Sequence, residues 1–157
     1  MKSLSALLTH KKSLQIGDRA PCLTAVDQDG VPVDLDLAYA RGPVLVYFYL
    51  REGTPVCTAH ACRFRDGFSR LNESDIQIFG VSGDTSGRLQ KFKEKYQLPF
   101  RLLADPEGKI AAGFGVPTFL GFPARRAFLI RDGLVAWQGK ASESSEVFRL
   151  LASAAAV

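Results

Sequence analysis

The feature that most constrains the fold is a continuous apolar run at residues 44–50, Val-Leu-Val-Tyr-Phe-Tyr-Leu, in which β-branched and aromatic side chains follow one another. A strand with one face in water alternates apolar and polar residues, and this run does not. The run therefore predicts a β-strand that is buried on both faces at the centre of a sheet.

The rest of the chain alternates strand-like and helical patterns around this run. The predicted strands are residues 76–81 and 100–103, and the predicted helices are residues 86–96, 107–114 and 143–154. Asp84 or Thr85 is available to cap the helix at 86–96. A further helix follows the central strand, because apolar side chains recur there at spacings of four and three residues. They are Cys57, Ala61, Phe64, Phe68 and Leu71.

Two Asp-Gly dipeptides each separate a pair of short strand-like segments. Asp29-Gly30 lies between segments 22–26 and 31–35, and Asp132-Gly133 lies between segments 127–131 and 134–137. Asp-Gly between apolar segments is a strong signal for a tight hairpin turn. The sequence thus predicts one β-hairpin near the start of the chain and another near its end.

This order of elements predicts an α/β fold with a mixed central β-sheet, helices on both faces and an N-terminal β-hairpin. Strands that alternate with helices form parallel units with right-handed crossovers, whereas the last hairpin adds antiparallel strands. The length of 157 residues suits one domain. We expect an N-terminal arm at residues 1–13 and a single domain at residues 14–157.

Charge and hydropathy argue against two classes of partner. The net charge is +4, from 20 basic and 16 acidic residues, and the longest basic run is Lys11-Lys12. Nucleic-acid-binding proteins concentrate basic charge on one face or in one run, so we expect no nucleic-acid partner. No apolar stretch approaches the roughly 20 residues of a membrane helix, so we expect no membrane association.

The cysteines indicate a reducing compartment. The N-terminal segment lacks the long apolar region and the cleavage site of a signal peptide, and the chain has three cysteines. In a chain that has few cysteines and no export signal, a disulfide scaffold is not expected. The cysteines of such a chain are more often catalytic, redox-sensing or metal-binding. We therefore expect a cytoplasmic protein whose cysteines have a chemical role.

Cys57 occupies a position that favours a thiolate. Thr54 suits the N-cap of the helix after the central strand and Pro55 suits its first turn, so Cys57 falls at the third helical position. The helix dipole stabilises an anion there by about 0.3–1 kcal/mol. Lowering the pKa of a thiol by two units takes about 2.7 kcal/mol. A nearby cation is therefore required, and an arginine is the expected kind because it stays charged.

Cys62 follows Cys57 by five residues. On an intact helix their Cα atoms would be about 8–9 Å apart, whereas a disulfide rarely spans more than about 7 Å. A disulfide between them requires the first turn to unwind, which suits a transient bond better than a structural one. The alternative for Cys62 is a small core residue, which is the role we assign to Cys22. His60 with both thiols gives only three metal ligands, whereas structural zinc sites have four.

Seven stretches of the chain form a set of motifs that belong together. They are Tyr47-Phe48-Tyr49, Thr54-Pro55-x-Cys57-Thr58-x-x-Ala61-Cys62-x-Phe64-Arg65-Asp66, Gly17-Asp18-Arg19-Ala20-Pro21, Asp27-Gln28-Asp29-Gly30, Gly80-Val81-Ser82, Asp105-Pro106-Glu107-Gly108-Lys109 and Arg125-x-x-Phe128-Leu129-Ile130. Together they resemble peroxiredoxins of the bacterioferritin comigratory protein (PrxQ) type. The resemblance extends over residues 14–151, and its cysteine motif and the later arginine are specific in combination.

The resemblance implies a thioredoxin-like fold and a thiol peroxidase without a metal or organic cofactor. Cys57 would be the peroxidatic cysteine and Cys62 the resolving cysteine, which forms an intramolecular disulfide that thioredoxin or a similar thiol reductant opens. Thr54 would hydrogen-bond the peroxide, and Arg125 would supply the cation. Arg126 is the alternative, although adjacent strand residues face opposite ways. The substrates would be hydrogen peroxide and organic hydroperoxides, and the protein a monomer or homodimer.

The sequence departs from this pattern at Leu50, where the family usually has proline, and at His60, where it usually has an acid. Residues 115–118, Gly-Val-Pro-Thr, resemble the cis-proline loop of thioredoxin-like reductases, but Arg125 holds the place before the late strand and favours a peroxidase. The apolar segment 114–122 is a pocket rim, a dimer surface or a loop that covers the core. The alternative functions are a thiol–disulfide reductase and a non-enzymatic redox sensor or binding protein.

Overall fold

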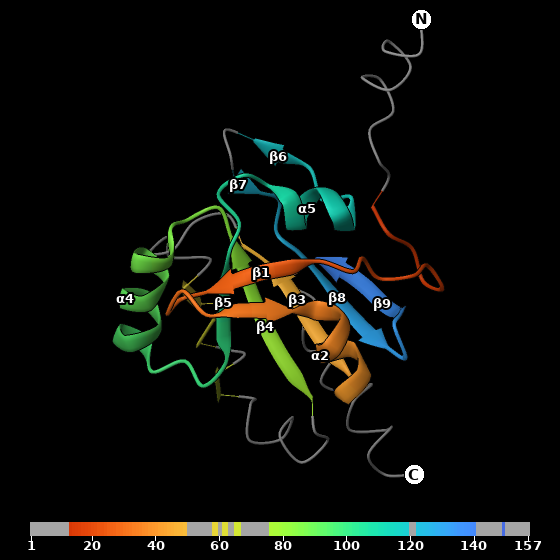
Figure 1. The fold of residues 1–157 in the computed structure, drawn as a ribbon, viewed down its shortest axis with the longest axis horizontal. Helices are drawn as coiled ribbons and strands as arrows, with labels where there is room; N and C mark the ends of the chain where they lie inside the picture. The colour runs from red at the N-terminus through yellow and green to blue at the C-terminus, as the bar shows by residue number, and fades with distance from the viewer. Residues whose placement is uncertain are drawn as a thin grey trace, which may run out of the picture.

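The computed structural model describes residues 13–49, 58–59, 61–62, 65–66, 76–119, 122–140 and 149. Its main feature is a seven-stranded mixed sheet with the strand order β2-β1-β5-β4-β3-β8-β9 (Figure 1). The strands of this sheet are β1 (Thr24–Asp27), β2 (Pro32–Asp34), β3 (Val44–Phe48), β4 (Gln77–Ser82), β5 (Arg101–Ala104), β8 (Arg126–Arg131) and β9 (Leu134–Lys140). The helices are α2 (Leu35–Arg41), α4 (Ser86–Tyr96) and α5 (Lys109–Phe114), and a small separate hairpin comprises β6 (Thr118–Phe119) and β7 (Phe122–Pro123).

The predicted central strand is confirmed. β3 pairs in parallel with β4 and antiparallel with β8, and every residue from Val44 to Phe48 is buried. Because successive side chains point to opposite faces, Val46 belongs to one hydrophobic cluster and Tyr47 to another. The run has no polar residues because each of its two faces packs into one of these hydrophobic clusters.

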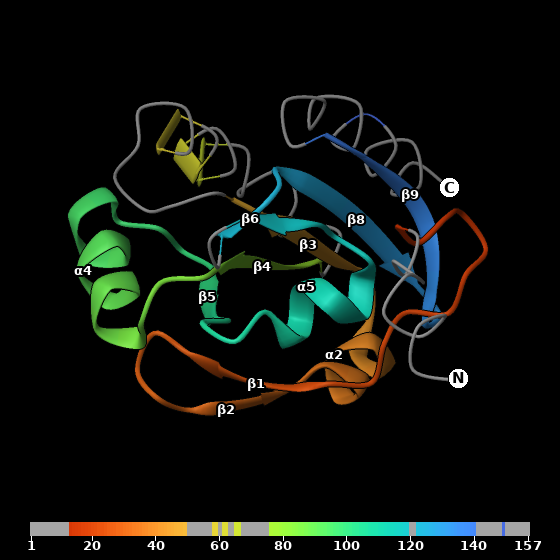
Figure 2. The ribbon, with the colours of Figure 1, turned by 90° about the horizontal axis from the view of Figure 1, so that it is seen from above.

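Helices cover both faces of the sheet, as predicted. α2 and α5 contribute Leu35 and Phe114 to one cluster, whereas α4 contributes Phe92 and the helix after β3 contributes Ala61 to the other. In Figure 2 the described pieces of that helix, in yellow, lie on one side of β3 and β4, and α2 and α5 lie on the other. The helix that carries Cys62 is therefore packed on the same face as α4.

Both predicted hairpins are present. β1 and β2 pair antiparallel around Asp29-Gly30, and β8 and β9 pair antiparallel around Asp132-Gly133. Asp132 and Gly133 both have positive φ, 53° and 78°, as a two-residue type I′ turn requires. β8 of the second hairpin lies next to β3. The residues at the start of β8 therefore lie beside the end of the central strand.

The remaining predictions concern the helices. α4 has the predicted bounds, and its N-cap is Thr85, whose side chain makes no capping hydrogen bond. α5 begins at Lys109 because Gly108, with φ of 70°, precedes it as N-cap. The C-terminal helix predicted at 143–154 lies outside the described residues except for Arg149, which is helical. Of the helix predicted from Cys57, the described positions are also helical.

α2 was not predicted. The second strand of the first hairpin was expected to extend to residue 35, with no helix after it. In the structure the Asp34 carboxylate accepts hydrogen bonds from the amides of Asp36 (2.9 Å) and Leu37 (3.4 Å), which begins a helix at Leu35. Leu35, Ala38 and Tyr39 are the buried residues of this helix, at helical spacing. Both signals, the cap and the spacing, were present in the sequence.

Candidate active site

The structure describes only part of the predicted site. Thr54 and Cys57 lie outside the described residues, as do Leu50 and His60. The strand that leads to them is described: β3 ends at Phe48, and the Tyr49 amide continues its pairing by donating to the Val81 carbonyl at 3.1 Å. In the sequence, the predicted site residues therefore come shortly after the carboxyl end of the central strand.

Arg125 lies at this same end of the sheet. Arg126, the first residue of β8, pairs with Phe48, the last residue of β3, and Arg125 directly precedes it. Since the two strands are antiparallel, the start of β8 and the end of β3 meet at one edge of the sheet. Arg125 is exposed and Arg126 is half-buried. The fold thus brings the predicted cation to the end of the strand from which the Cys57 segment departs.

Cys62 is a free thiol in helical conformation and is half-buried. Its neighbour Ala61 is buried in the cluster that contains Tyr47 and Tyr49. Three residues after Cys62, the Arg65 guanidinium donates to the backbone carbonyl of Tyr96 at 2.8 Å. These contacts attach the Cys62 helix to the sheet and to the end of α4.

Arg65 is paired with the neighbouring carboxylate. Its Nε donates to Asp66 Oδ1 at 3.0 Å. This hydrogen bond raises the pKa of Arg65 against the opposing effect of desolvation, and smaller electrostatic contributions act in the same direction. Arg65 was not singled out from the sequence, although its place three residues after Cys62 puts both residues on one helix face.

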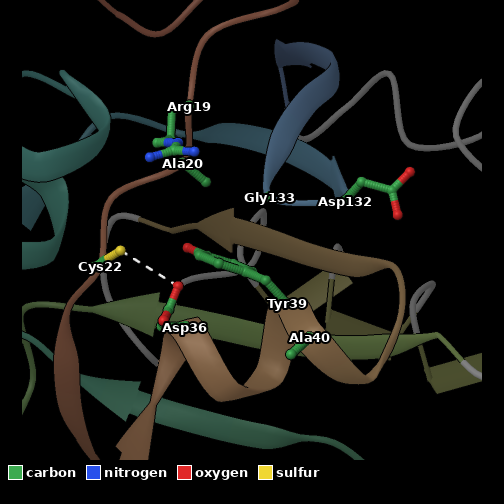
Figure 3. A pocket seen from close by; sticks show the side chains of 8 residues that line it. All are labelled: Arg19, Ala20, Cys22, Asp36, Tyr39, Ala40, Asp132 and Gly133. Carbon is green, nitrogen blue, oxygen red and sulfur yellow. Dashed lines mark hydrogen bonds between the residues drawn. The ribbon is translucent and has the colours of Figure 1, made fainter.

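The prediction that Cys22 is a small core residue is wrong, because Cys22 is exposed. Its thiol lies before β1 and donates a hydrogen bond to Asp36 Oδ1 of α2 at 3.3 Å (Figure 3). This hydrogen bond and the charge of Asp36 raise the pKa of Cys22. The reason for the error is that the strand pattern at 22–26 was extended too far: β1 begins only at Thr24.

Cys22 lines a surface hollow of about 600 Å³ together with side chains from α2 and the β8–β9 turn (Figure 3). The Tyr39 hydroxyl beside it donates to the Pro21 carbonyl at 3.2 Å. Burial, and then the charges of Cys22 and Asp36, raise the pKa of Tyr39 above its ordinary value. The surroundings thus favour the protonated forms of Cys22 and Tyr39.

The apolar segment 114–122 divides into two parts. Phe114 is buried against the rings of Phe48 and Phe128, with ring centroids 5.5 and 5.0 Å away, so the first part covers the core. The second part forms the β6–β7 hairpin, in which Phe119 is 78% exposed. The peptide bond before Pro117 is trans, since the described residues contain no cis bond. The segment therefore resembles a cis-proline loop in sequence but not in the conformation of the peptide bond before Pro117.

Two negative findings apply to the described residues. Within these ranges there is no group of three or more His, Cys, Asp or Glu side chains that could hold a metal ion. The metal alternative for His60 and Cys57 falls outside them. No helix in the described part of the chain is long and apolar enough to cross a membrane.

The central mixed sheet, flanked by helices and by a hairpin at each end of the described chain, defines an α/β protein of the thioredoxin-like class. Comparison with known proteins gives the family: a model of the AhpC/TSA family matches residues 16–138. The chain belongs to the AhpC/TSA family. The predicted fold class and the predicted resemblance to PrxQ proteins are both confirmed by the relatives below.

Among named proteins, the chain is 39% identical over 122 residues to a chloroplastic peroxiredoxin Q of Suaeda salsa, covering 76% of this chain and 56% of that protein. It is 38% identical over 136 residues to the chloroplastic peroxiredoxin Q of Arabidopsis thaliana, covering 85% and 62%. The chain thus spans little more than half the length of these relatives.

Among solved structures, the peroxidoxin BcpB of Mycobacterium tuberculosis superimposes with a TM-score of 0.82 at 30% identity, covering 90% of this chain and 97% of that one. Peroxiredoxin Q of Xanthomonas campestris superimposes with a TM-score of 0.79 at 22% identity, over 90% and 97% of the two chains. The second match concerns the fold alone.

Proposed function

We propose that the protein is a thiol-dependent peroxidase that reduces hydrogen peroxide and organic hydroperoxides through Cys57. The observation that carries the proposal is the register of β3 with β8, in which Phe48 pairs with Arg126. In a chain of the AhpC/TSA family, this register puts Arg125 at the end of the strand that leads to Thr54 and Cys57. A thiolate requires such a cation, because a helix terminus alone stabilises it too weakly.

In the first step the Cys57 thiolate attacks one oxygen of the peroxide. A sulfur–oxygen bond forms and the O–O bond breaks, so the sulfur is oxidised and the peroxide reduced. The second oxygen leaves as water or an alcohol after it takes a proton, and Cys57 becomes a sulfenic acid. Thr54 hydrogen-bonds the peroxide, and Arg125 stabilises the thiolate and the charge that develops on the oxygens.

In the second step Cys62 resolves the sulfenic acid. The Cys62 thiolate attacks the Cys57 sulfur, a disulfide forms, and the oxygen leaves as water after protonation. Cys62 is helical and five positions after Cys57, a spacing that exceeds disulfide reach on an intact helix. This step therefore includes local unwinding of the helix before Cys62.

A thiol reductant completes the cycle, and we propose thioredoxin or a protein of similar chemistry. The reductant attacks the Cys57–Cys62 disulfide, is itself oxidised and returns both thiols. The proposed location is the cytoplasm, where thiols are kept reduced; the plant relatives carry names that place those proteins in the chloroplast. We propose a monomer or a homodimer, which sedimentation of the reduced and oxidised protein distinguishes.

Stopped-flow reaction of the reduced protein with hydrogen peroxide and with an alkyl hydroperoxide tests the proposal. The expected result is a second-order rate far above that of a free thiol, lost in Cys57→Ser and retained in Cys22→Ser. A rate equal to that of free cysteine, unaffected by Cys57→Ser, would contradict it. Insulin reduction without peroxide turnover would indicate a reductase instead. One oxidation without turnover in excess reductant would indicate a redox sensor.

A further inference from the structure

The surface hollow at Cys22 carries charged groups that the proposed peroxidase reaction does not use. Its volume is about 600 Å³, and its lining includes Arg19, Cys22 and two residues of α2, Asp36 and Tyr39 (Figure 3). Small-molecule sites have volumes of about 300–1,000 Å³. The hollow is therefore large enough for a small ligand, and the side chains that line it determine which ligand fits.

The walls of the hollow are held together by hydrogen bonds between separate elements. The Ala20 amide donates to the Gly133 carbonyl at 2.9 Å, and Arg19 forms an isolated β-bridge with the first residue of β9. On the side of α2, the Tyr39 hydroxyl donates to the Pro21 carbonyl at 3.2 Å. A site that is formed in advance loses little conformational entropy when a ligand binds.

The charged side chains of the hollow do not pair with one another. Among the residues that the structure describes, the Arg19 guanidinium has no hydrogen bond or ion pair. Asp36 has no cationic partner there, and its carboxylate accepts a hydrogen bond from the Cys22 thiol at 3.3 Å. The side chain of Asp132, which also lines the hollow, points away from Cys22 in Figure 3. One guanidinium and one carboxylate near a thiol suit a ligand that carries a carboxylate and an ammonium.

Asp36 keeps Cys22 in the thiol form. Its hydrogen bond, and then its charge, raise the pKa of Cys22; the charge of Arg19 opposes this effect, and the more distant Asp34 adds to it. Only the thiolate is a nucleophile. An ammonium bound to Asp36 would replace the thiol as hydrogen-bond donor and offset the carboxylate charge, so it would favour ionisation of Cys22. A ligand with an ammonium close to its own sulfur therefore promotes its own reaction with Cys22.

We propose that the hollow is a site at which Cys22 forms a reversible mixed disulfide with an amino-acid disulfide of the cystine type, whose ammonium binds Asp36 and whose carboxylate binds Arg19. In this class of disulfide two carbons separate the ammonium from the sulfur. That separation suits a carboxylate that lies 3.3 Å from the Cys22 sulfur. The inference goes beyond the proposed peroxidase function, because it uses neither Cys57 nor Cys62.

In the reaction, Cys22 gives its proton to solvent and its thiolate attacks one sulfur of the ligand. A new sulfur–sulfur bond forms, the disulfide bond of the ligand breaks, and the second half of the ligand leaves as a thiolate that takes up a proton. Cys22 is oxidised and the ligand disulfide is reduced, so the ligand itself is the oxidant. Hydrogen peroxide has no ammonium that binds Asp36, so with peroxide Cys22 stays in the thiol form.

The experiment uses Cys57→Ser, Cys62→Ser protein, in which Cys22 is the one cysteine left. Intact-protein mass spectrometry follows the mixed disulfide at about pH 7 with cystine, with cystamine, which has the ammonium but no carboxylate, and with the uncharged bis(hydroxyethyl) disulfide. Each rate is divided by the rate of the same reagent with mercaptoethanol, which corrects for the reactivity of the reagent. An exposed charge pair contributes about two- to fivefold. We therefore expect cystine to exceed cystamine, and cystamine to exceed the uncharged reagent, by about this factor each.

Two variants separate the two contacts. Arg19→Gln should remove the preference for cystine over cystamine and leave the preference for cystamine over the uncharged reagent. Asp36→Asn should remove the second preference and speed the uncharged reagent, because the thiol then ionises more easily. A residue with a merely structural role would change all three rates by the same factor. Arg41→Gln removes an exposed arginine from the last turn of α2; it is the matched control and should leave the three relative rates unchanged.

Equal relative rates for the three reagents would overturn the inference, and so would a preference for cystamine that persists in Asp36→Asn. Circular dichroism checks that the variants are folded. A second measurement needs neither variant: high salt screens exposed charges, so it should reduce both preferences in protein that retains Arg19 and Asp36, and preferences that salt does not change would also overturn the inference. No peroxide is used, so these results do not depend on whether Cys57 reduces peroxide.

Discussion

The two described thiols have neighbours of opposite charge. Cys22 is exposed, and its thiol donates to the Asp36 carboxylate at 3.3 Å. Cys62 is half-buried and shares a helix with Arg65. Exposure alone would make Cys22 the more reactive of the two. The Asp36 carboxylate opposes ionisation of Cys22, so we expect the opposite order.

If the protein has the proposed function, the comparison explains how an exposed cysteine would stay out of peroxide chemistry. Asp36 belongs to the first turn of α2, which Asp34 caps, so the carboxylate is held by a helix and not by a loop. Arg65 is likewise held by the Tyr96 carbonyl of a neighbouring helix. In both cases a helix terminus holds the charged side chain in place, and at Cys22 this charge lies in hydrogen-bond contact with the thiol.

The largest expected effect separates the two thiols by function. Cys62→Ser removes the resolving thiol, so we expect thioredoxin-coupled turnover of peroxide to fall about tenfold or more. Cys22→Ser should leave turnover within about twofold. Steady-state consumption of hydrogen peroxide in excess reductant measures both. A larger loss in Cys22→Ser than in Cys62→Ser would reverse the comparison.

A smaller effect concerns the charge at Cys22. Asp36 raises the pKa of Cys22, so Asp36→Asn should lower it and speed alkylation at neutral pH about threefold. With Asp36 present, the folded-state pKa lies above the unfolded value. The hydrogen bond to Asp36 therefore favours folding below the unfolded pKa and is lost as pH rises through the folded one. Alkylation rates that do not change in Asp36→Asn would show that the carboxylate does not control Cys22.

The cap of α2 offers a test through stability. Asp34→Ala removes the acceptor of two amide hydrogen bonds and should lower the free energy of unfolding by about 1 kcal/mol. Thr85→Ala is the matched control, because the Thr85 side chain makes no capping hydrogen bond, and should cost much less. Urea unfolding of both variants measures the difference. If Asp34 also fixes Asp36, alkylation of Cys22 should rise, but by less than in Asp36→Asn.

The smallest expected effect is at Asp66. Asp66→Asn leaves Arg65 without its carboxylate partner and should lower the free energy of unfolding by less than about 1 kcal/mol, because the pair is exposed to water. The loss should disappear at high salt, which screens exposed charges. Urea unfolding at low and high salt measures it, and a loss of several kcal/mol would mean that the pair fixes the helix that carries Cys62.

The parts of the fold that could be predicted are those that depend on local patterns. The unbroken apolar run predicted β3, and the two Asp-Gly pairs predicted both hairpin turns. α2 was missed because the alternating pattern of the first hairpin continues to Asp34, where the chain changes from strand to helix. Asp34 is both the last residue of strand β2 and the N-cap of helix α2.

The site was predictable to a lesser degree. The cap and spacing of the cysteine helix are local, whereas the place of Arg125 depends on the pairing of β8 with β3, which the resemblance to a family supplied and the local pattern did not. The contacts Cys22–Asp36 and Arg65–Tyr96 join residues 14 and 31 positions apart. They are contacts between side chains or carbonyls of separate elements, and no periodicity in the sequence encodes them.

We propose that Cys62, and not the more exposed Cys22, forms the disulfide with Cys57. Treatment of the reduced protein with one equivalent of hydrogen peroxide, followed by alkylation and peptide mass spectrometry, shows which cysteine it is. We expect a Cys57–Cys62 crosslinked peptide within one chain and an alkylated Cys22. A disulfide that contains Cys22, within the chain or between two chains, would contradict it.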